Sequence, residues 1–136
     1  MASCLLIAGQ RAHLTESMAG LHRHAQLAKS LITTSKVRIV LEELSLPYED
    51  EIVGFAQVKE KAYTEINPNG RIPAIYDPNA DLTLWESGPM LTYLCEQYDK
   101  DHKLSYDSFF EKHHMNQWLA YQISGGRHDL ICNHFR

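Results

Sequence analysis

The stretch INPNGRIPAIYDP, residues 66–78, decides the fold because it contains a turn that reverses the chain, followed by a proline within a predicted strand. Residues 67–70, Asn-Pro-Asn-Gly, are four turn-forming residues in a row, so the chain must reverse there. Residues 71–76 then predict a strand. A second turn at 77–80 leads to a short apolar stretch at 82–85, and the two strands are expected to form a hairpin with a loose loop.

Pro73 is the first indication of a binding site. A proline inside a strand removes a ladder donor, so it is tolerated only where the backbone is not fully paired. If the Ile72–Pro73 bond is cis, the amide and carbonyl of Ile72 point outward and can pair with an extended peptide. A trans bond on an edge strand is the alternative interpretation.

The second indication lies at Glu86 and Ser87, where a strand is followed by a helix whose first amides are free. Such a helix terminus binds carboxylates through its N–H groups and its dipole. Ser87 adds a hydroxyl donor, and Glu86 can accept hydrogen bonds from an ammonium group, so the pair is expected to recognise a zwitterion. The alternative is a Ser87 that only caps the helix beside a solvated Glu86.

The remaining elements surround this unit. Apolar spacing predicts a helix from Ser35 to Leu46, which Pro47 ends. A strand at a sheet edge is expected over 48–55 and a short helix over 59–66. Further helices are predicted from Ser87, as its cap, and over 108–122.

Composition excludes several classes of protein. The formal charge of −4 and pI near 6.0 provide no basic surface for nucleic acid. No apolar run approaches the ~20 residues that span a bilayer. Cys4, Cys95 and Cys132 lie far apart, so a disulfide scaffold is not expected. His128, Cys132 and His134 lack a fourth ligand, so no metal is expected either.

Three stretches together resemble a known family. They are KVRIVLEELSLPYE (36–49), INPNGRIPAIYDP (66–78) and LTLWESGPMLTYL (82–94). Residues 36–106 resemble the N-terminal domain of the fungal glutathione transferases, especially the branch related to the yeast nitrogen-catabolite regulator. The resemblance implies an α/β, thioredoxin-like fold, a mixed sheet flanked by helices.

The resemblance also implies the site. Pro73 would be cis, Ile72 would pair with the cysteinyl backbone of glutathione, and Glu86 and Ser87 would hold its γ-glutamyl end. Arg71 with Lys59 or Lys61 would meet the glycyl carboxylate. Glutathione is thus expected as co-substrate, with an unknown electrophile as the second substrate.

The sequence departs from the family before the first predicted helix. There the family has a central strand and a loop that carries a Tyr, Ser, Cys or Asn facing the glutathione sulfur, whereas residues 22–35 read HRHAQLAKSLITTS. The first strand is therefore expected to be missing. Thr33, Thr34 and Ser35 are the candidate catalytic residues, since a hydroxyl at the helix N-terminus would favour a thiolate. A plain capping role for Ser35 is the alternative.

We therefore expect an atypical N-terminal extension over 1–30, a thioredoxin-like domain over 31–102, and the truncated start of an all-α C-terminal domain over 107–136. The predicted function is a glutathione transferase in the cytoplasm. The alternatives are a non-catalytic glutathione-binding or regulatory module and an inactive truncated splice product. The family suggests a homodimer, although the missing helical half weakens that expectation; no nucleic-acid or membrane partner is expected.

Overall fold

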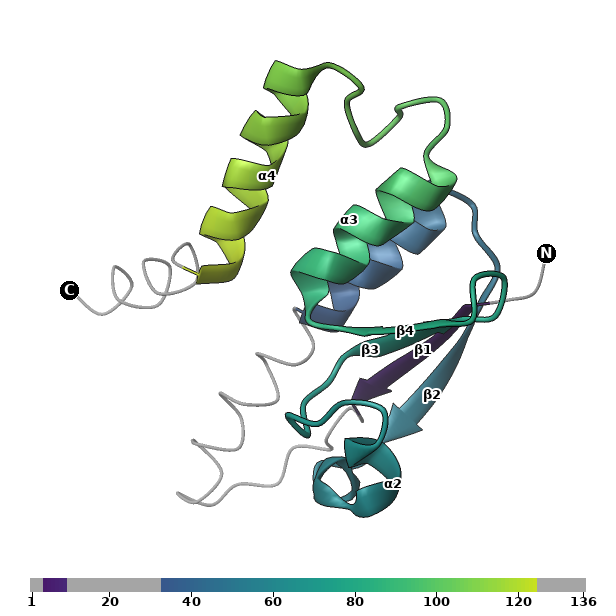
Figure 1. The fold of residues 1–136 in the computed structure, drawn as a ribbon. Helices are drawn as coiled ribbons and strands as arrows, with labels where there is room; N and C mark the ends of the chain where they lie inside the picture. The colour runs from purple at the N-terminus through teal and green to yellow at the C-terminus, as the bar shows by residue number, and fades with distance from the viewer. Residues whose placement is uncertain (1–3, 10–32, 125–136) are drawn as a thin grey trace, which may run out of the picture.

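A mixed four-stranded sheet forms the centre of the molecule, for which the computed structural model describes residues 4–9 and 33–124 (Figure 1). Its strand order is β2-β1-β3-β4. Strand β1 pairs parallel with β2 and antiparallel with β3, and β3 pairs antiparallel with β4. The bounds of the strands are β1 Cys4–Gly9, β2 Tyr48–Val53, β3 Ala74–Asp77 and β4 Leu82–Trp85.

Strand β1 corrects one expectation from the sequence. The first strand is present and occupies the middle of the sheet, but it is formed by CLLIAG at Cys4–Gly9 and not by residues just before the first helix. This short apolar run suits a central strand because Leu6 and Ile7 are buried on opposite faces of the sheet. The thioredoxin-like α/β class is confirmed. Residues 10–32, most of the predicted extension, lie outside the described residues.

Helices cover both faces of the sheet (Figure 1). A helix over 33–43 lies beside α3, Ser87–Tyr98, on one face. The short η1, Gln57–Lys59, and α2, Lys61–Thr64, pack on the other face. The edge strand β2 and the hairpin of β3 and β4 confirm the order predicted from the sequence.

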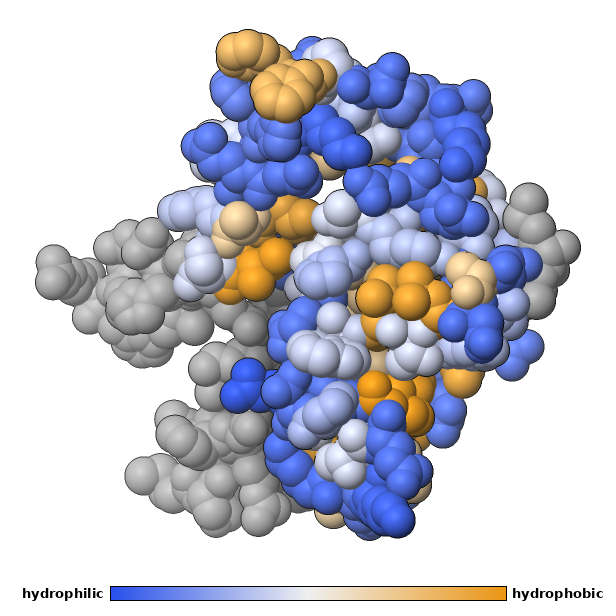
Figure 2. Space-filling model, viewed as in Figure 1, coloured by the Kyte–Doolittle hydropathy of each residue, from blue (hydrophilic) through white to orange (hydrophobic). Residues whose placement is uncertain are grey.

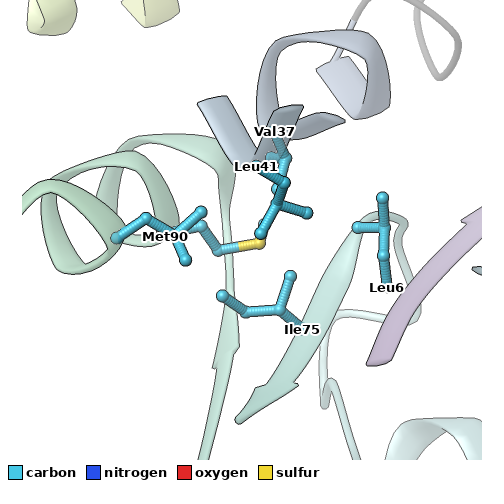
Figure 3. Close-up of a cluster of buried hydrophobic side chains, with 6 residues drawn as sticks. Leu6, Val37, Leu41, Ile75 and Met90 are labelled. Carbon is cyan, nitrogen blue, oxygen red and sulfur yellow. The ribbon is translucent and has the colours of Figure 1, made fainter. Parts of the chain in front are cut away.

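The main core lies between the sheet and its two long helices. Figure 3 shows side chains from β1, β3, the helix over 33–43 and α3 pointing toward one another. Burying each aliphatic side chain contributes about 1.5 to 3 kcal/mol. This core therefore fixes where the two helices begin relative to the strands. Its buried members are Leu6, Val37, Leu41, Ile75, Met90 and Leu94.

A buried carboxylate ties the hairpin to α3. Asp77 ends β3 and accepts hydrogen bonds from the Tyr93 hydroxyl at 2.7 Å, the Asn79 amide at 2.8 Å and the Tyr98 hydroxyl. Burial acts to raise the pKa of Asp77, but the hydrogen bonds from Tyr98, Tyr93 and Asn79 together hold that pKa below its usual value. The loose loop predicted at 77–80 is thus fixed by one charged side chain.

Helix α4, Phe109–Ser124, lies beyond α3 and away from the sheet (Figure 1). Ser108 and Glu111 form a capping pair at its start, because the Ser108 hydroxyl accepts from the Glu111 amide and bonds the Glu111 carboxylate at 2.6 Å. Phe109 and Phe110 are 75% and 74% exposed, and Figure 2 shows hydrophobic residues standing out at the top, where α4 begins. The proposed division into 31–102 and 107–136 remains a prediction. Within 4–9 and 33–124, no helix has the length and apolar character needed to cross a membrane.

Candidate functional site

A cavity of about 250 Å³ opens where the helix over 33–43, the loop before β3 and the start of α3 meet. Its volume lies near the lower end of the ~300 to 1,000 Å³ typical of small-molecule sites. Most predicted glutathione-binding residues line it, together with four residues that the sequence analysis did not assign to the site. The lining residues are Thr33, Lys36, Asn67, Arg71, Ile72, Pro73, Glu86, Ser87, Gln122 and Ile123.

The loop before β3 forms one wall of the cavity. The Arg71 carbonyl accepts a hydrogen bond from the Tyr63 hydroxyl at 2.7 Å and another from the Asn67 side-chain amide at 2.6 Å. Asn67 is 1% exposed and Tyr63 is 4% exposed, and both bonds are partly buried. Sheet pairing of β3 begins only at Ala74, which places Ile72 outside the ladder and in the cavity wall. The Ile72–Pro73 bond is cis, as predicted.

The start of α3 forms the opposite wall. Glu86 precedes the helix with a φ of 69°, a left-handed conformation that costs a non-glycine residue about 1 to 3 kcal/mol and occurs often at functional sites. Ser87 is therefore the first helical residue and not the cap, which corrects the prediction. Because Pro89 has no N–H, Ser87 and Gly88 supply the free amides of this first turn.

Both predicted polar contacts of this turn face the cavity. Ser87 is 3% exposed and lines the wall, and the Glu86 side chain is exposed and makes no capping hydrogen bond. A carboxylate and an ammonium group of one ligand can therefore meet donors and an acceptor that are adjacent in sequence.

The three candidate catalytic hydroxyls are separated by the structure. Thr33 lines the cavity. Thr34 is 2% exposed, and its hydroxyl has no hydrogen-bond partner within the described part of the chain. Ser35 lies inside the helix, where it lines a second, shallower groove with Arg38, so it does not cap the helix. The catalytic role of all three stays a prediction, and Thr33 has the best position for it.

The predicted contacts to the glycyl carboxylate are also separated. Arg71 lines the cavity. Lys59 donates from Nζ to the Asn69 carbonyl at 3.2 Å and is not among the cavity residues. Lys61 is 90% exposed and pairs with Glu65 at 3.8 Å. Arg71 therefore lines the cavity and the two lysines do not, and the contact of all three with the glycyl carboxylate stays a prediction.

Four further residues of the cavity were missed from the sequence. Asn67 was assigned only to a turn, and Lys36 only to the family resemblance. Gln122 and Ile123 come from the end of α4, and their approach joins residues far apart in the chain. The Lys36 Nζ donates to the Gln122 Oε1 at 2.6 Å across 86 positions of sequence, a contact that no local pattern indicates.

The two cysteines in the described part of the chain, Cys4 and Cys95, do not provide a reactive thiol at this site. Cys4 is buried, and its burial followed by the charge of Asp77 raises the pKa of its thiol to about 11. Burial likewise raises the pKa of Cys95. Neither of these two residues, the cysteines that lie in 4–9 and 33–124, lines the cavity. The predicted His128, Cys132 and His134 cluster lies outside the described residues, and residues 4–9 and 33–124 hold no group of metal ligands.

Comparison with known proteins agrees with this geometry. Residues 33–97 match the family described as the glutathione S-transferase N-terminal domain. The chain is 55% identical over 91 residues to the glutathione S-transferase-like protein gedE of Aspergillus terreus, covering 66% of this chain and 40% of that protein. It is 38% identical over 96 residues to the protein URE2 of Debaryomyces hansenii, covering 66% of this chain and 31% of that one.

A solved structure gives the same result for the fold. The chain superposes on a glutathione transferase homolog from Lodderomyces elongisporus, crystallised with two glutathione molecules per subunit. The TM-score is 0.72 at 29% identity, with 91% of this chain and 51% of the homolog covered. The chain thus spans 40% of the length of the first curated relative and about half of this structural one. From the matched residues, the fold and the relatives together, we conclude that the chain carries the N-terminal, thioredoxin-like domain of the glutathione S-transferases.

Proposed function

We propose that the cavity binds glutathione and that the protein transfers it to an electrophilic small molecule. The observation that carries this proposal is the convergence of Ile72, Glu86 and Ser87 on one cavity, although they come from two different segments. The arrangement offers an acceptor for an ammonium group beside donors for a carboxylate. A γ-glutamyl group carries both of these charges on one carbon atom.

The proposed position of glutathione follows from the arrangement of the residues that line the cavity. The γ-glutamyl end lies at the first turn of α3, with its carboxylate on the Ser87 hydroxyl and the free amides and its ammonium on Glu86. The cysteinyl backbone runs along Ile72, and the glycyl carboxylate extends toward Arg71. The thiol then points to the remaining wall, where Thr33 begins the described part of the first helix.

The proposed reaction is nucleophilic attack by the glutathione sulfur. The thiol releases its proton to solvent, and the thiolate forms a bond from sulfur to an electrophilic carbon. In a substitution, the leaving group departs with the electron pair of the broken bond. The Thr33 hydroxyl supports this step by donating a hydrogen bond to the thiolate. We place this reaction in the cytoplasm.

A second candidate function is a glutathione-binding module without turnover. The similarity to the protein URE2 of Debaryomyces hansenii stands beside the similarity to transferase-like proteins, so the family relationship alone does not select conjugation. In this alternative the same cavity holds glutathione, but the thiol is not activated.

Retention on glutathione-agarose and a conjugation assay with chlorodinitrobenzene separate these functions. Retention together with turnover supports the transferase, whereas retention without turnover supports the binding module. A chain that folds but is not retained would contradict both. The matched variant is Glu86→Gln, which keeps the size of the side chain while removing its charge, and it should lower retention because the ammonium group loses its anion.

A further inference from the structure

Two side chains hold the backbone carbonyl of Arg71 in the loop before β3. The Tyr63 hydroxyl donates to this oxygen at 2.7 Å, and the Asn67 Nδ2 donates to it at 2.6 Å. A carbonyl oxygen has two lone pairs, so the two donors use its full capacity to accept hydrogen bonds. The direction of this carbonyl is therefore fixed by residues that precede it in the chain.

Tyr63 is anchored in the core on the face of the sheet that α2 covers (Figure 1). Its ring is buried and packs in one cluster with Ile7, Val58 and Ala74. Burial raises the pKa of the Tyr63 hydroxyl to about 12. The hydroxyl therefore keeps its proton near neutral pH, and it remains a hydrogen-bond donor to the loop.

Asn67 is fixed at both ends of its side chain. Its Oδ1 accepts from the Asn69 amide at 3.0 Å, which leaves Nδ2 as the end that faces the Arg71 carbonyl. Its backbone is paired as well, because its amide donates to the Tyr63 carbonyl at 2.9 Å and its carbonyl accepts from the Gly70 amide at 2.8 Å. An ionised aspartate of the same shape would present an acceptor to the Arg71 carbonyl in place of a donor.

The direction of the Arg71 carbonyl sets the direction of the Ile72 amide. The Arg71–Ile72 peptide is trans, and the C=O and N–H groups of a planar trans peptide point in opposite directions. The Ile72 N–H therefore points away from Tyr63 and Asn67. Ile72 lines the cavity and precedes Ala74, where the sheet pairing of β3 begins. The two donors, and not the sheet ladder of β3, thus orient this amide.

We propose that Tyr63 and Asn67 are positioning residues for glutathione, because they fix the Arg71–Ile72 peptide so that the Ile72 amide donates to the cysteinyl carbonyl of the ligand. This inference rests on the proposed function, since it needs glutathione along Ile72. A group that is already oriented before binding adds no ordering cost when the ligand arrives. Without the two donors, the loop would have to be ordered by the ligand itself, and the affinity would fall.

The test compares two tyrosine variants by calorimetric titration with glutathione. Tyr63→Phe removes one donor to the Arg71 carbonyl and should weaken binding about threefold to tenfold, the net effect of one ordinary hydrogen bond. Tyr93→Phe is the matched control, because it removes an equally short and partly buried hydroxyl bond, 2.7 Å long, to Asp77 outside the cavity. It should lower the free energy of unfolding and leave the glutathione affinity unchanged. Asn67→Asp should weaken binding about tenfold or more, because it turns a donor into an acceptor.

Nuclear magnetic resonance of the backbone amides separates positioning from a general loss of stability. At saturating glutathione, the shift of the Ile72 amide signal should be smaller in Tyr63→Phe than in the unsubstituted chain, because its N–H is no longer held toward the ligand. The shifts of the Ser87 and Gly88 amides should be the same in both, since these residues begin α3. A purely structural role would lower the unfolding midpoint and leave the saturated spectra alike.

Four outcomes would overturn the inference. Equal affinities of Tyr63→Phe and the unsubstituted chain would do so, as would equal losses of affinity in Tyr63→Phe and Tyr93→Phe. A loss in Asn67→Asp alone would make Asn67 a direct ligand contact, since it also lines the cavity. If Asn67→Asp does not fold, Tyr63→Phe decides the question. Absence of glutathione binding by the unsubstituted chain would overturn the proposed function together with this inference, whereas the other three outcomes overturn the inference alone.

Discussion

Gly70 closes the turn that leads into the candidate site, and replacing it with alanine tests how that turn is built. Its φ is 55°, and its amide donates to the Asn67 carbonyl at 2.8 Å. A Cβ at this position would lie 2.7 Å from the Val58 carbonyl oxygen, a backbone atom that cannot rotate away. Gly70→Ala therefore combines an unfavourable conformation with a steric clash.

The two costs can be added. A left-handed conformation costs an L-residue roughly 1 to 2 kcal/mol, and overpacking against a fixed group typically costs about 1 to 3 kcal/mol. Gly70→Ala should therefore lower the free energy of unfolding by about 2 to 5 kcal/mol. With a denaturant slope of about 1 to 3 kcal/mol/M, the urea midpoint should fall by about 1 M or more.

Gly54→Ala is the matched control for this urea titration, followed by circular dichroism. A Cβ at Gly54 would meet the Gln57 Oε1 at 3.0 Å, and that atom is the end of a flexible side chain. Gly70 is the glycine with positive φ among the described residues, so Gly54→Ala adds no such conformational cost. We expect a change below about 1 kcal/mol. Equal midpoints for the two variants would refute the reasoning.

Three further predictions concern charge and the site. Asp77 has a lowered pKa in the folded state, so its contribution to stability is full above about pH 4, the usual aspartate value, and is lost as the pH falls through the lower folded value. Urea unfolding across acidic pH should therefore show a weaker pH dependence for Asp77→Asn, and an unchanged dependence would contradict this assignment. Ser87→Ala should weaken glutathione binding by about 1 to 2 kcal/mol in calorimetric titration, because a hydrogen bond to a charged carboxylate is lost; unchanged affinity would remove Ser87 from the site. Thr33→Val should lower turnover of chlorodinitrobenzene about tenfold or more, whereas Ser35→Ala should leave it unchanged, and the reverse order would move the thiol to the other groove.

Most of the fold could be predicted from local patterns in the sequence. The turn at 67–70, the hairpin and the helix before Pro47 follow from turn chemistry and apolar spacing, which act over a few residues. Strand β1 was missed because its place in the middle of the sheet is set by pairing with β2 and β3, and CLLIAG carries no alternation to mark it. A short apolar run of this kind does not by itself distinguish a buried strand from other structures.

The residues of the candidate site likewise fall into those that local motifs indicate and those that depend on long-range packing. Sequence motifs indicated three of the residues that line the cavity, Ile72, Glu86 and Ser87. Gln122 was missed because its contact with Lys36 depends on how α4 packs, which is long-range information. Ser35 was named for its position near the start of a helix, but a hydroxyl two residues after Thr33 faces a different side of that helix. To predict which of the three adjacent hydroxyls faces the cavity, one must know where the helix begins and which face each residue occupies.

The most direct test of the account is a titration of the isotope-labelled chain with glutathione, followed by nuclear magnetic resonance of its backbone amides. We predict that the amide signals of Ile72, Ser87 and Gly88 shift in a saturable way. The amides of Ile39 and Tyr48, beside the second groove, should stay in place. Shifts confined to that groove, or no shifts at any glutathione concentration, would contradict the claim that the tripeptide lies between the loop before β3 and the first turn of α3.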